Sequence, residues 1–255
     1  MPVDAQLVAF DLDDTLAPSK SPLPEPVASV LSRLLEQASV AIVSGGQIGQ
    51  FREQVTSRLT AASPRGLGRL HLMPVTGTQY WRYVDGEWAL QYEDGLGQDE
   101  KAAALAAIET VAKELGYWEA ETWGPVLEDR GSQITFSALG QRAPVEAKKA
   151  WDPSGEKKNR LAAAVQQLLP QLSVRSGGST SIDVTRAGVD KGYALERLSE
   201  VSGIPIARML FVGDRLDPEG NDYPVVRTGV RTLAVAGWEE TVAYLEGLLG
   251  GTSCD

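Results

Sequence analysis

The stretch Val8–Leu16 reads Val-Ala-Phe-Asp-Leu-Asp-Asp-Thr-Leu, and it joins a short apolar run to a group of acids. Leu7–Phe10 is apolar throughout, which is typical of a buried strand, and Asp11, Asp13 and Asp14 follow it directly. Like charges so close together cost free energy unless a cation or bound protons neutralise them. The stretch therefore predicts a buried strand that ends at a site for a cation or for protons.

Strand and helix patterns alternate in two separated parts of the chain, which is typical of βαβ units and a parallel sheet. The predicted strands are 7–10, 40–43, 70–75, 209–212 and 232–235. The predicted helices are 24–37, 47–59, 193–201 and 239–249. We therefore predict a Rossmann-like α/β core with three layers, made of residues 1–80 and 187–255.

The middle of the chain, residues 81–186, has the pattern of an antiparallel sheet with helices. Asp85-Gly86 and Gly177-Gly178 are predicted hairpin turns. Helices are predicted at 98–115 and 161–169, a strand at 132–137 and a polar loop at 151–160. Since insertion of a domain at a surface loop is well tolerated, we predict an inserted α+β cap domain that selects the substrate.

The composition is that of an ordinary globular protein with an acidic surface. The 255 residues include 24 Lys and Arg against 34 Asp and Glu, a net charge of −10, which argues against nucleic acid or an anionic membrane as the main partner. The single cysteine, Cys254, excludes an intrachain disulfide. With no signal peptide or long apolar run, we expect a cytoplasmic protein, either a monomer or a homodimer.

Polar residues lie after several predicted strands, where ligands bind in a parallel sheet, or, in the case of Lys191, at the start of a predicted helix. They are Asp11, Asp13, Ser44, Lys191, Asp214 and Asp222. This set suits phosphoryl transfer, because one carboxylate can attack phosphorus and a second can protonate the leaving oxygen. Carboxylate oxygens are also the ligands of Mg²⁺, and a hydroxyl and an ammonium group can bind phosphoryl oxygens.

Four segments resemble, in order, the motifs of the haloacid dehalogenase-like superfamily of Mg-dependent phosphohydrolases. They are Asp11–Thr15, Ser44 in "VSGG", Lys191 in "DKGYAL" and "GDRLDPEGND" at 213–222. The resemblance implies that Asp11 is the nucleophile, that Asp13 is the general acid and base, and that Ser44, Gly45 and Lys191 act on the phosphate.

The resemblance also implies a magnesium site. Its ligands would be Asp11, the main-chain carbonyl of Asp13 and Asp214, with Asn221 and Asp222 in or near the ligand shell.

The insertion between the second and third motifs resembles the type IIB subgroup, and within it the eukaryotic-type phosphomannomutases. The segments "EDRGSQITFSALG" at 128–140 and "GGSTSIDV" at 177–184 are similar to segments of those enzymes. This resemblance implies substrate contacts for Arg130, Ser181 and Asp183.

The chain departs from the mutases at two cap arginines, where it has Trp123 and Gln141, although Arg142 lies one position further on. A mutase binds phosphate at both ends of a sugar bisphosphate, which requires strong cationic donors. We therefore predict a Mg-dependent phosphatase that acts on a small phosphorylated metabolite, a sugar phosphate, through an aspartyl-phosphate. The alternatives are a phosphomannomutase-like mutase with the same nucleophile and a non-catalytic binding protein.

Three residues also have structural interpretations. The lone histidine, His71, is expected to be structural, since it lies in the apolar run 70–75. Ser44 can serve as a helix N-cap as well as a phosphate ligand. Asp217 is expected on the loop surface, although acids of the fourth motif surround it.

Overall fold

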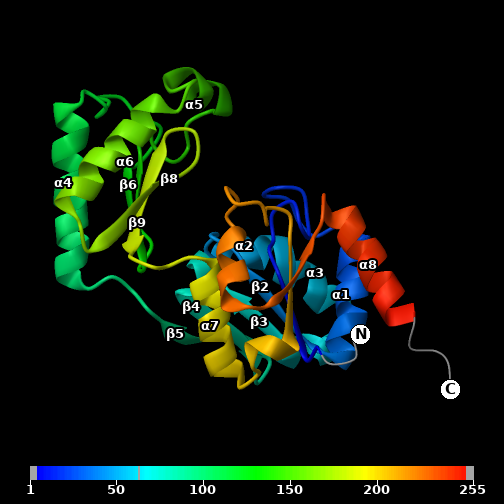
Figure 1. The fold of residues 1–255 in the computed structure, drawn as a ribbon. Coiled ribbons are helices and arrows are strands. Elements are labelled where there is room, and N and C mark those ends of the chain that lie inside the picture. The colour runs from blue at the N-terminus through cyan, green and yellow to red at the C-terminus, as the bar shows by residue number, and fades with distance from the viewer. Residues whose placement is uncertain (1–4, 63, 251–255) are drawn as a thin grey trace. The chain divides into compact units, whose positions relative to one another are not determined.

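The structure is a computed structural model that describes residues 5–62 and 64–250 (Figure 1). The chain forms two compact units, Met1–Glu93 with Val189–Asp255, and Asp94–Gly188. Cys254 lies outside the described residues. Within the described part, no helix is both long and apolar enough to cross a bilayer.

The first unit contains a seven-stranded sheet with the order β11-β10-β1-β2-β3-β4-β5. The strands are β1 (Leu7–Phe10), β2 (Ser39–Val43), β3 (Leu70–Met73), β4 (Gln79–Val84), β5 (Glu87–Glu93), β10 (Met209–Gly213) and β11 (Arg231–Ala234). Strands β11, β10, β1, β2 and β3 are parallel, as predicted, and β4 and β5 add an antiparallel edge.

Helices cover both faces of this sheet, which explains the unbroken apolar runs of its strands. Val8 and Phe10 of β1 belong to a core shared with α1, α3 and α8, whereas Leu7 and Ala9 belong to a second core shared with α7. The helices are α1 (Glu25–Gln37), α2 (Ile48–Phe51), α3 (Ser57–Ala62), α7 (Lys191–Ser202) and α8 (Trp238–Gly250). The predicted three-layer α/β core is confirmed.

Shorter helical turns complete the first unit. They are η1, a π-helix at Arg52–Thr56, and the 3₁₀ turns η2 (Pro64–Arg69), η3 (Val75–Gly77), η4 (Ile206–Arg208) and η5 (Tyr223–Thr228). The helix predicted at 47–59 is therefore interrupted, because η1 inserts a wider turn between α2 and α3.

The hairpin at Asp85-Gly86 is confirmed, but it extends the parallel sheet. Both turn residues have left-handed φ values, 52° and 91°, which a two-residue hairpin turn requires and glycine adopts without cost. Strand β4 pairs with β3, so the second unit begins at Asp94, and the boundary predicted at residue 81 differs from the structure. Strand periodicity does not reveal which sheet edge a hairpin joins.

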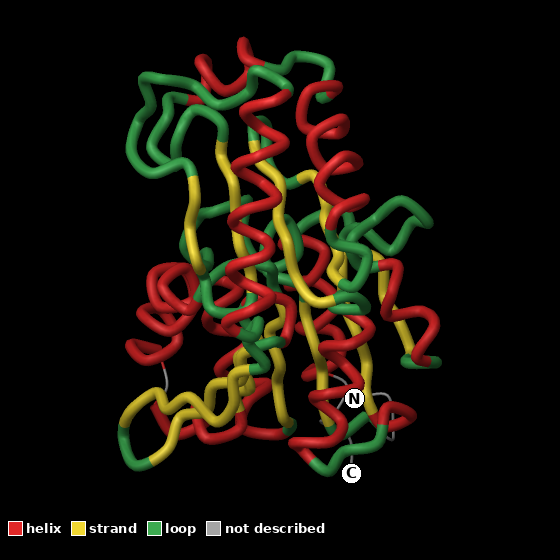
Figure 2. The backbone as a smooth tube through the Cα atoms, turned by 90° about the vertical axis from the view of Figure 1, so that its left-hand side faces the viewer, coloured by secondary structure: helices red, strands yellow, loops and turns green. Residues whose placement is uncertain are grey.

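The second unit contains an antiparallel sheet with the order β6-β7-β9-β8, next to which its helices lie (Figure 2). Its strands are β6 (Leu127–Asp129), β7 (Gln133–Ser137), β8 (Leu172–Ser176) and β9 (Ser181–Arg186), and its helices α4 (Gln98–Glu114), α5 (Val145–Trp151) and α6 (Glu156–Leu168). The antiparallel α+β architecture is confirmed.

The polar loop predicted at 151–160 is partly wrong, because α6 already begins at Glu156. Residues 156–160 at the start of α6 are polar and exposed or half-buried, so their composition resembles that of a loop. The buried carboxylate of Asp152 accepts the Lys157 and Lys158 backbone N–H groups at 3.2 and 3.0 Å, which caps this helix start.

His71 is buried in β3, as its apolar surroundings predicted, and it is neutral. Its Nδ1 atom lies 2.9 Å from the Tyr80 hydroxyl oxygen, which also accepts a hydrogen bond from Arg82 at 3.0 Å. Since arginine can only donate, the hydrogen of the Tyr80 hydroxyl remains available for a hydrogen bond to Nδ1 of His71. Burial, and secondarily the charge of Arg82, lowers the pKa of His71 from 6.5 to about 3.

Acid is therefore expected to destabilise the protein through His71. Above pH 6.5 the residue is neutral in both states, and below it only the unfolded state binds a proton until the pH approaches 3. The expected loss reaches roughly 4–5 kcal/mol by pH 3, and the variant His71→Gln lacks this part of the acid sensitivity. Because His71 is the single histidine, one imidazole NMR signal reports it, and titration of that signal near pH 6.5 in the folded protein contradicts the prediction.

Candidate active site

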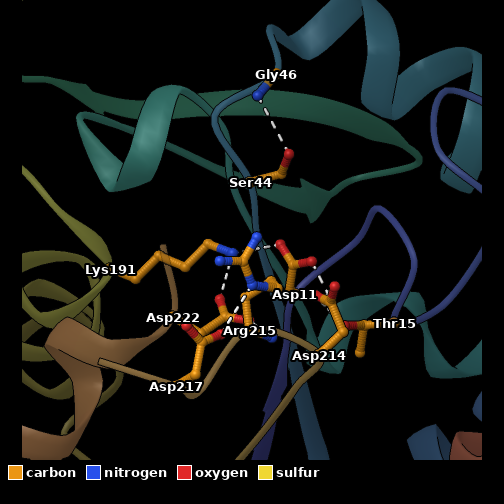
Figure 3. A network of polar contacts seen from close by, with 9 residues as sticks. All are labelled: Asp11, Thr15, Ser44, Gly46, Lys191, Asp214, Arg215, Asp217 and Asp222. Carbon is orange, nitrogen blue, oxygen red and sulfur yellow. Dashed lines mark hydrogen bonds and ion pairs between the residues drawn. The ribbon is translucent and has the colours of Figure 1, made fainter. Parts of the chain in front are cut away.

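Three carboxylates meet at the carboxyl ends of two neighbouring strands of the first unit. Asp11 follows β1, and its backbone N–H donates to the Val212 carbonyl of β10 at 3.0 Å. Asp214 follows β10, and Asp222 lies in the loop beyond it. One oxygen from each of the three carboxylates lies within 4.8 Å of the others, and Figure 3 shows these side chains gathered together.

Lys191 is the cation of this cluster. It is the first residue of α7 and only 3% exposed, and its ammonium group donates to Asp11 and to Asp222. A positive charge is unfavourable at a helix N-terminus, so these carboxylates supply the compensating interaction. The helix start is fixed by Asp190, which accepts the Tyr193 N–H at 3.0 Å and pairs with Arg227 at 2.7 and 2.8 Å.

Burial and mutual repulsion shape the ionisation of the cluster. Burial raises the pKa of the Asp11 carboxyl from 3.8 to about 7, although Lys191 opposes the rise, and Asp222 adds to it. Burial and the charge of Asp222 also raise the pKa of Asp214. Burial alone would lower the pKa of Lys191, but Asp11 and Asp222 together raise it. Lys191 therefore keeps its proton, and its single charge does not fully compensate the carboxylates.

This arrangement fits a hard divalent cation. Carboxylate oxygens from Asp11, Asp214 and Asp222 are close enough to share one ion, and they are the ligand type that Mg²⁺ prefers. The raised pKa values of Asp11 and Asp214 indicate a local excess of negative charge, which such an ion would offset.

A threonine joins two of the carboxylates. The Thr15 hydroxyl is buried and lies 3.4 Å from Asp11 Oδ2 and 3.3 Å from Asp214 Oδ1, so it can donate to either. Thr15 belongs to the first motif, but the sequence alone assigned it no role. Its position four residues after Asp11 is a signal only once the turn between them is known.

Ser44 lies at the end of β2, the other strand that pairs with β1. Its hydroxyl accepts the Gly46 N–H at 3.2 Å, and its carbonyl accepts the Thr76 N–H at 2.9 Å. Gly45 is exposed between them. The loop that follows β3 therefore fixes the loop that follows β2, and the backbone strain of Val75 and Thr76, with left-handed φ values of 48° and 55°, lies at this contact.

The other predicted ligands occupy different positions. The Asp13 carboxylate points to the Lys20 backbone N–H at 2.6 Å and the Gln50 amide at 3.3 Å, so its side chain is not part of the three-carboxylate group. Asn221 is exposed and directly precedes the fully buried Asp222. Asp217 is on the surface, as predicted, where it pairs with Arg215 at 2.8 Å.

The predicted substrate residues of the second unit form a cluster of their own. Asp183 of β9 accepts hydrogen bonds at 2.7 Å from both Gln133 and Thr135 of β7. Burial raises the pKa of Asp183, against the lowering effect of Thr135 and Arg130. The Arg130 guanidinium is held by Glu128 at 2.7 and 2.9 Å. Sequence reasoning missed Glu128, Gln133 and Thr135, because their partners lie on other strands or turns.

Ser181 belongs to the same part of this sheet. A Cβ atom at Gly177 would lie 2.8 Å from Ser181 Oγ and 2.9 Å from Asp183 Oδ2, so glycine is needed at this turn for the two side chains to occupy their positions. Trp123 is 47% exposed, and Arg142 donates its backbone N–H to the Trp123 carbonyl at 3.0 Å.

Comparison with known proteins relates this sequence to a family of enzymes. The sequence model of the family described as eukaryotic phosphomannomutase matches residues 120–250, just over half of the chain. A phosphomannomutase of Saccharomyces cerevisiae is 25% identical over 229 residues, which cover 86% of this chain and 84% of the yeast protein.

Two solved structures share the fold. An IMP-nucleotidase of Plasmodium falciparum superposes with a TM-score of 0.70 at 16% identity, covering 98% of this chain and 69% of that one. A trehalose-6-phosphate phosphatase of Aspergillus fumigatus gives 0.61 at 15% identity, with coverages of 97% and 93%. Because the family model matches more than half of the chain, the chain belongs to the eukaryotic phosphomannomutase family, within the haloacid dehalogenase-like superfamily of enzymes.

Proposed function

We propose that this protein is a Mg²⁺-dependent phosphatase of a small sugar phosphate and that it works through an aspartyl-phosphate. The observation that carries the proposal is the buried group of Asp11, Asp214 and Asp222 around Lys191. It combines a candidate nucleophile, a candidate metal site and a fixed ammonium group at the carboxyl end of a parallel sheet.

In this proposal Asp11 attacks phosphorus while the bond from phosphorus to the leaving oxygen breaks. Asp13 gives its proton to that oxygen, which releases the sugar, and then takes a proton from the water that hydrolyses the aspartyl-phosphate. Ser44, the Gly45 backbone and Lys191 bind the phosphoryl oxygens as charge develops on them. Bound Mg²⁺, held by Asp11, the Asp13 carbonyl and Asp214 with Asn221 and Asp222 in support, would supply positive charge to the same oxygens.

In the second unit, the charges around Arg130 favour a phosphatase over a mutase. Its cluster of Arg130, Glu128 and Asp183 combines one cation with two carboxylates, and Glu128 already occupies the guanidinium. Such a surface suits the hydroxyl groups of a sugar, which donate to carboxylates, better than a second phosphate. We propose that Arg130, Ser181 and Asp183 recognise the sugar in this way.

The second candidate is a sugar-phosphate mutase with the same nucleophile, which the family match supports. In a mutase, phosphorylated Asp11 would transfer its phosphate to the sugar monophosphate, and the resulting bisphosphate would rebind in the opposite orientation, so that Asp11 takes the phosphate from the other end and the isomeric monophosphate is released. Mannose 1-phosphate, incubated with and without a catalytic amount of the sugar bisphosphate, separates the two reactions. Free phosphate as the main product supports the phosphatase, and bisphosphate-dependent mannose 6-phosphate supports the mutase.

The proposed activity is tested with a panel of sugar phosphates in the presence of Mg²⁺ or of EDTA. We expect phosphate release that falls by at least about 100-fold when the metal is removed, because the carboxylate cluster then lacks its neutralising ion. Thermal unfolding with and without Mg²⁺ provides an independent reading, with a higher midpoint expected when Mg²⁺ is bound. Release that EDTA leaves unchanged would contradict the metal site.

A further inference from the structure

Both carboxylate oxygens of Asp13 have a fixed donor in the first unit. The Lys20 backbone N–H donates to Oδ1 at 2.6 Å, and the Gln50 side-chain amide donates to Oδ2 at 3.3 Å. Lys20 adopts a left-handed φ of 58°, which is uncommon for a residue with a side chain. The shorter bond is therefore at Oδ1, and the longer contact is at Oδ2.

The Gln50 side chain reaches Asp13 across a glycine. A Cβ atom at Gly46 would lie 2.1 Å from Oε1 and 2.6 Å from Cδ of Gln50, closer than any real contact. Gly46 is also the residue whose N–H donates to the Ser44 hydroxyl. The loop that follows β2 therefore serves two purposes, since it orients Ser44 and leaves space for the Gln50 amide.

The helical segment that carries Gln50 also supports the second donor. The π-helix η1 follows α2 directly, and its buried Gln54 donates to the Ser21 carbonyl at 2.7 Å. The Leu23 N–H returns a hydrogen bond to the Gln54 carbonyl at 2.9 Å. These bonds fix residues 21–23, which directly follow Lys20. Both donors to Asp13 therefore depend on this helical segment, since α2 carries Gln50 and η1 holds the chain beside Lys20. Single π turns inside helices often occur at functional sites.

We propose that Gln50 is a positioning residue, which aims Oδ2 of Asp13 at the leaving-group oxygen. This inference rests on the proposed function, because it takes Asp13 as the general acid. The proton moves from Oδ2 to the leaving oxygen as the bond from that oxygen to phosphorus breaks and the bond from Asp11 forms. Without the amide donor, the carboxyl group gains other rotamers and is less often aligned for the transfer.

The leaving group distinguishes this role from a general structural one. Sugar phosphates need a proton on the departing alkoxide, whereas p-nitrophenolate departs without one. For Gln50→Met, which keeps the shape and removes the donor, kcat/KM for mannose 6-phosphate is expected to fall by about tenfold. The value for p-nitrophenyl phosphate should change less than about twofold, because kcat/KM reports only the steps through phosphoryl transfer to Asp11.

Gln47→Met, in the residue before α2, is the matched control and should leave both values unchanged. The Lys20 backbone amide tests the inference without an activity measurement. In Gln50→Met its NMR signal should shift and its hydrogen should exchange faster with solvent, whereas neither should change in Gln47→Met. Equal losses for the two substrates, or an unmoved Lys20 signal, overturn the inference. A wild-type protein that hydrolyses neither substrate overturns the proposed function instead, and the Lys20 signal still decides whether Gln50 orders Asp13.

Discussion

Asp11→Asn is expected to reduce the rate of phosphate release by at least about 10⁴-fold, because an amide cannot form the aspartyl-phosphate. The side chain keeps its size, and Lys191 keeps Asp222 as a partner, so the folded structure should persist. Steady-state phosphate release gives the rate, and thermal unfolding should show a midpoint close to that of the wild type. The combination of normal folding and lost turnover assigns the effect to chemistry.

Asp217→Asn is the matched control for this prediction. Asp217 lies in the same acidic loop as Asp214 and Asp222, but its side chain is 48% exposed, where it pairs with the exposed Arg215 and accepts the Glu219 backbone N–H at 3.1 Å. Such surface pairs contribute little to stability, so activity and stability should both remain within about twofold and 1 kcal/mol of the wild type. If Asp11→Asn retained a tenth or more of the activity, Asp11 could not be the nucleophile.

Lys191→Met should damage both stability and activity. The Lys191 side chain is only 4% exposed, and its ammonium group lies between two buried carboxylates, so its removal leaves their charges without this compensating cation. The loss of one member of a buried ion pair costs about 3–5 kcal/mol. Urea unfolding measures this loss, and phosphate release is expected to fall by about 10³-fold, since a donor to the phosphoryl oxygens has gone.

A second substitution separates the two effects of Lys191→Met. In the double variant Lys191→Met/Asp222→Asn, one of the unpaired charges is removed, while the asparagine oxygen can still accept the Arg215 N–H that Asp222 accepts at 3.1 Å. At least half of the lost stability should return, but the activity should not. The free energy of unfolding is also measured for the single variant Asp222→Asn. If the loss in the double variant equals the sum of the losses in Lys191→Met and Asp222→Asn, charge repulsion is not the cause.

The parallel core was predictable because its signals are local. Strands buried on both faces, such as β1 and β10, are continuous apolar runs, and the helices between them repeat with their own period. The interruption of the helix at 47–59 was not predictable, because the backbone hydrogen bonds of η1 span one residue more than those of an α-helix and η1 uses ordinary residues. The sequence also did not predict which sheet the β4–β5 hairpin joins, since any free sheet edge can accept a hairpin.

Among the candidate site residues, the acids could be proposed from their positions after strands, because the carboxyl ends of parallel strands share one edge, and Lys191 from its position at a helix start, where a positive charge needs an anionic partner. Thr15, Gln50 and Glu128 could not be singled out. Each is an ordinary polar residue whose importance comes from a contact with a particular carboxylate or guanidinium group. Such contacts depend on side-chain direction, and composition and spacing do not contain it.

The amino-acid order alone determined the chemistry available to this protein: acids after apolar strands, a lysine at a helix start and an inserted polar segment. Tertiary structure decided how these groups affect one another. Only when folding buries Asp11, Asp222 and Lys191 together does the loss of water raise the pKa of Asp11 to about 7 and make an additional cation favourable. Solvation and charge–charge energies depend on distance and burial, and both arise only when the strands come together.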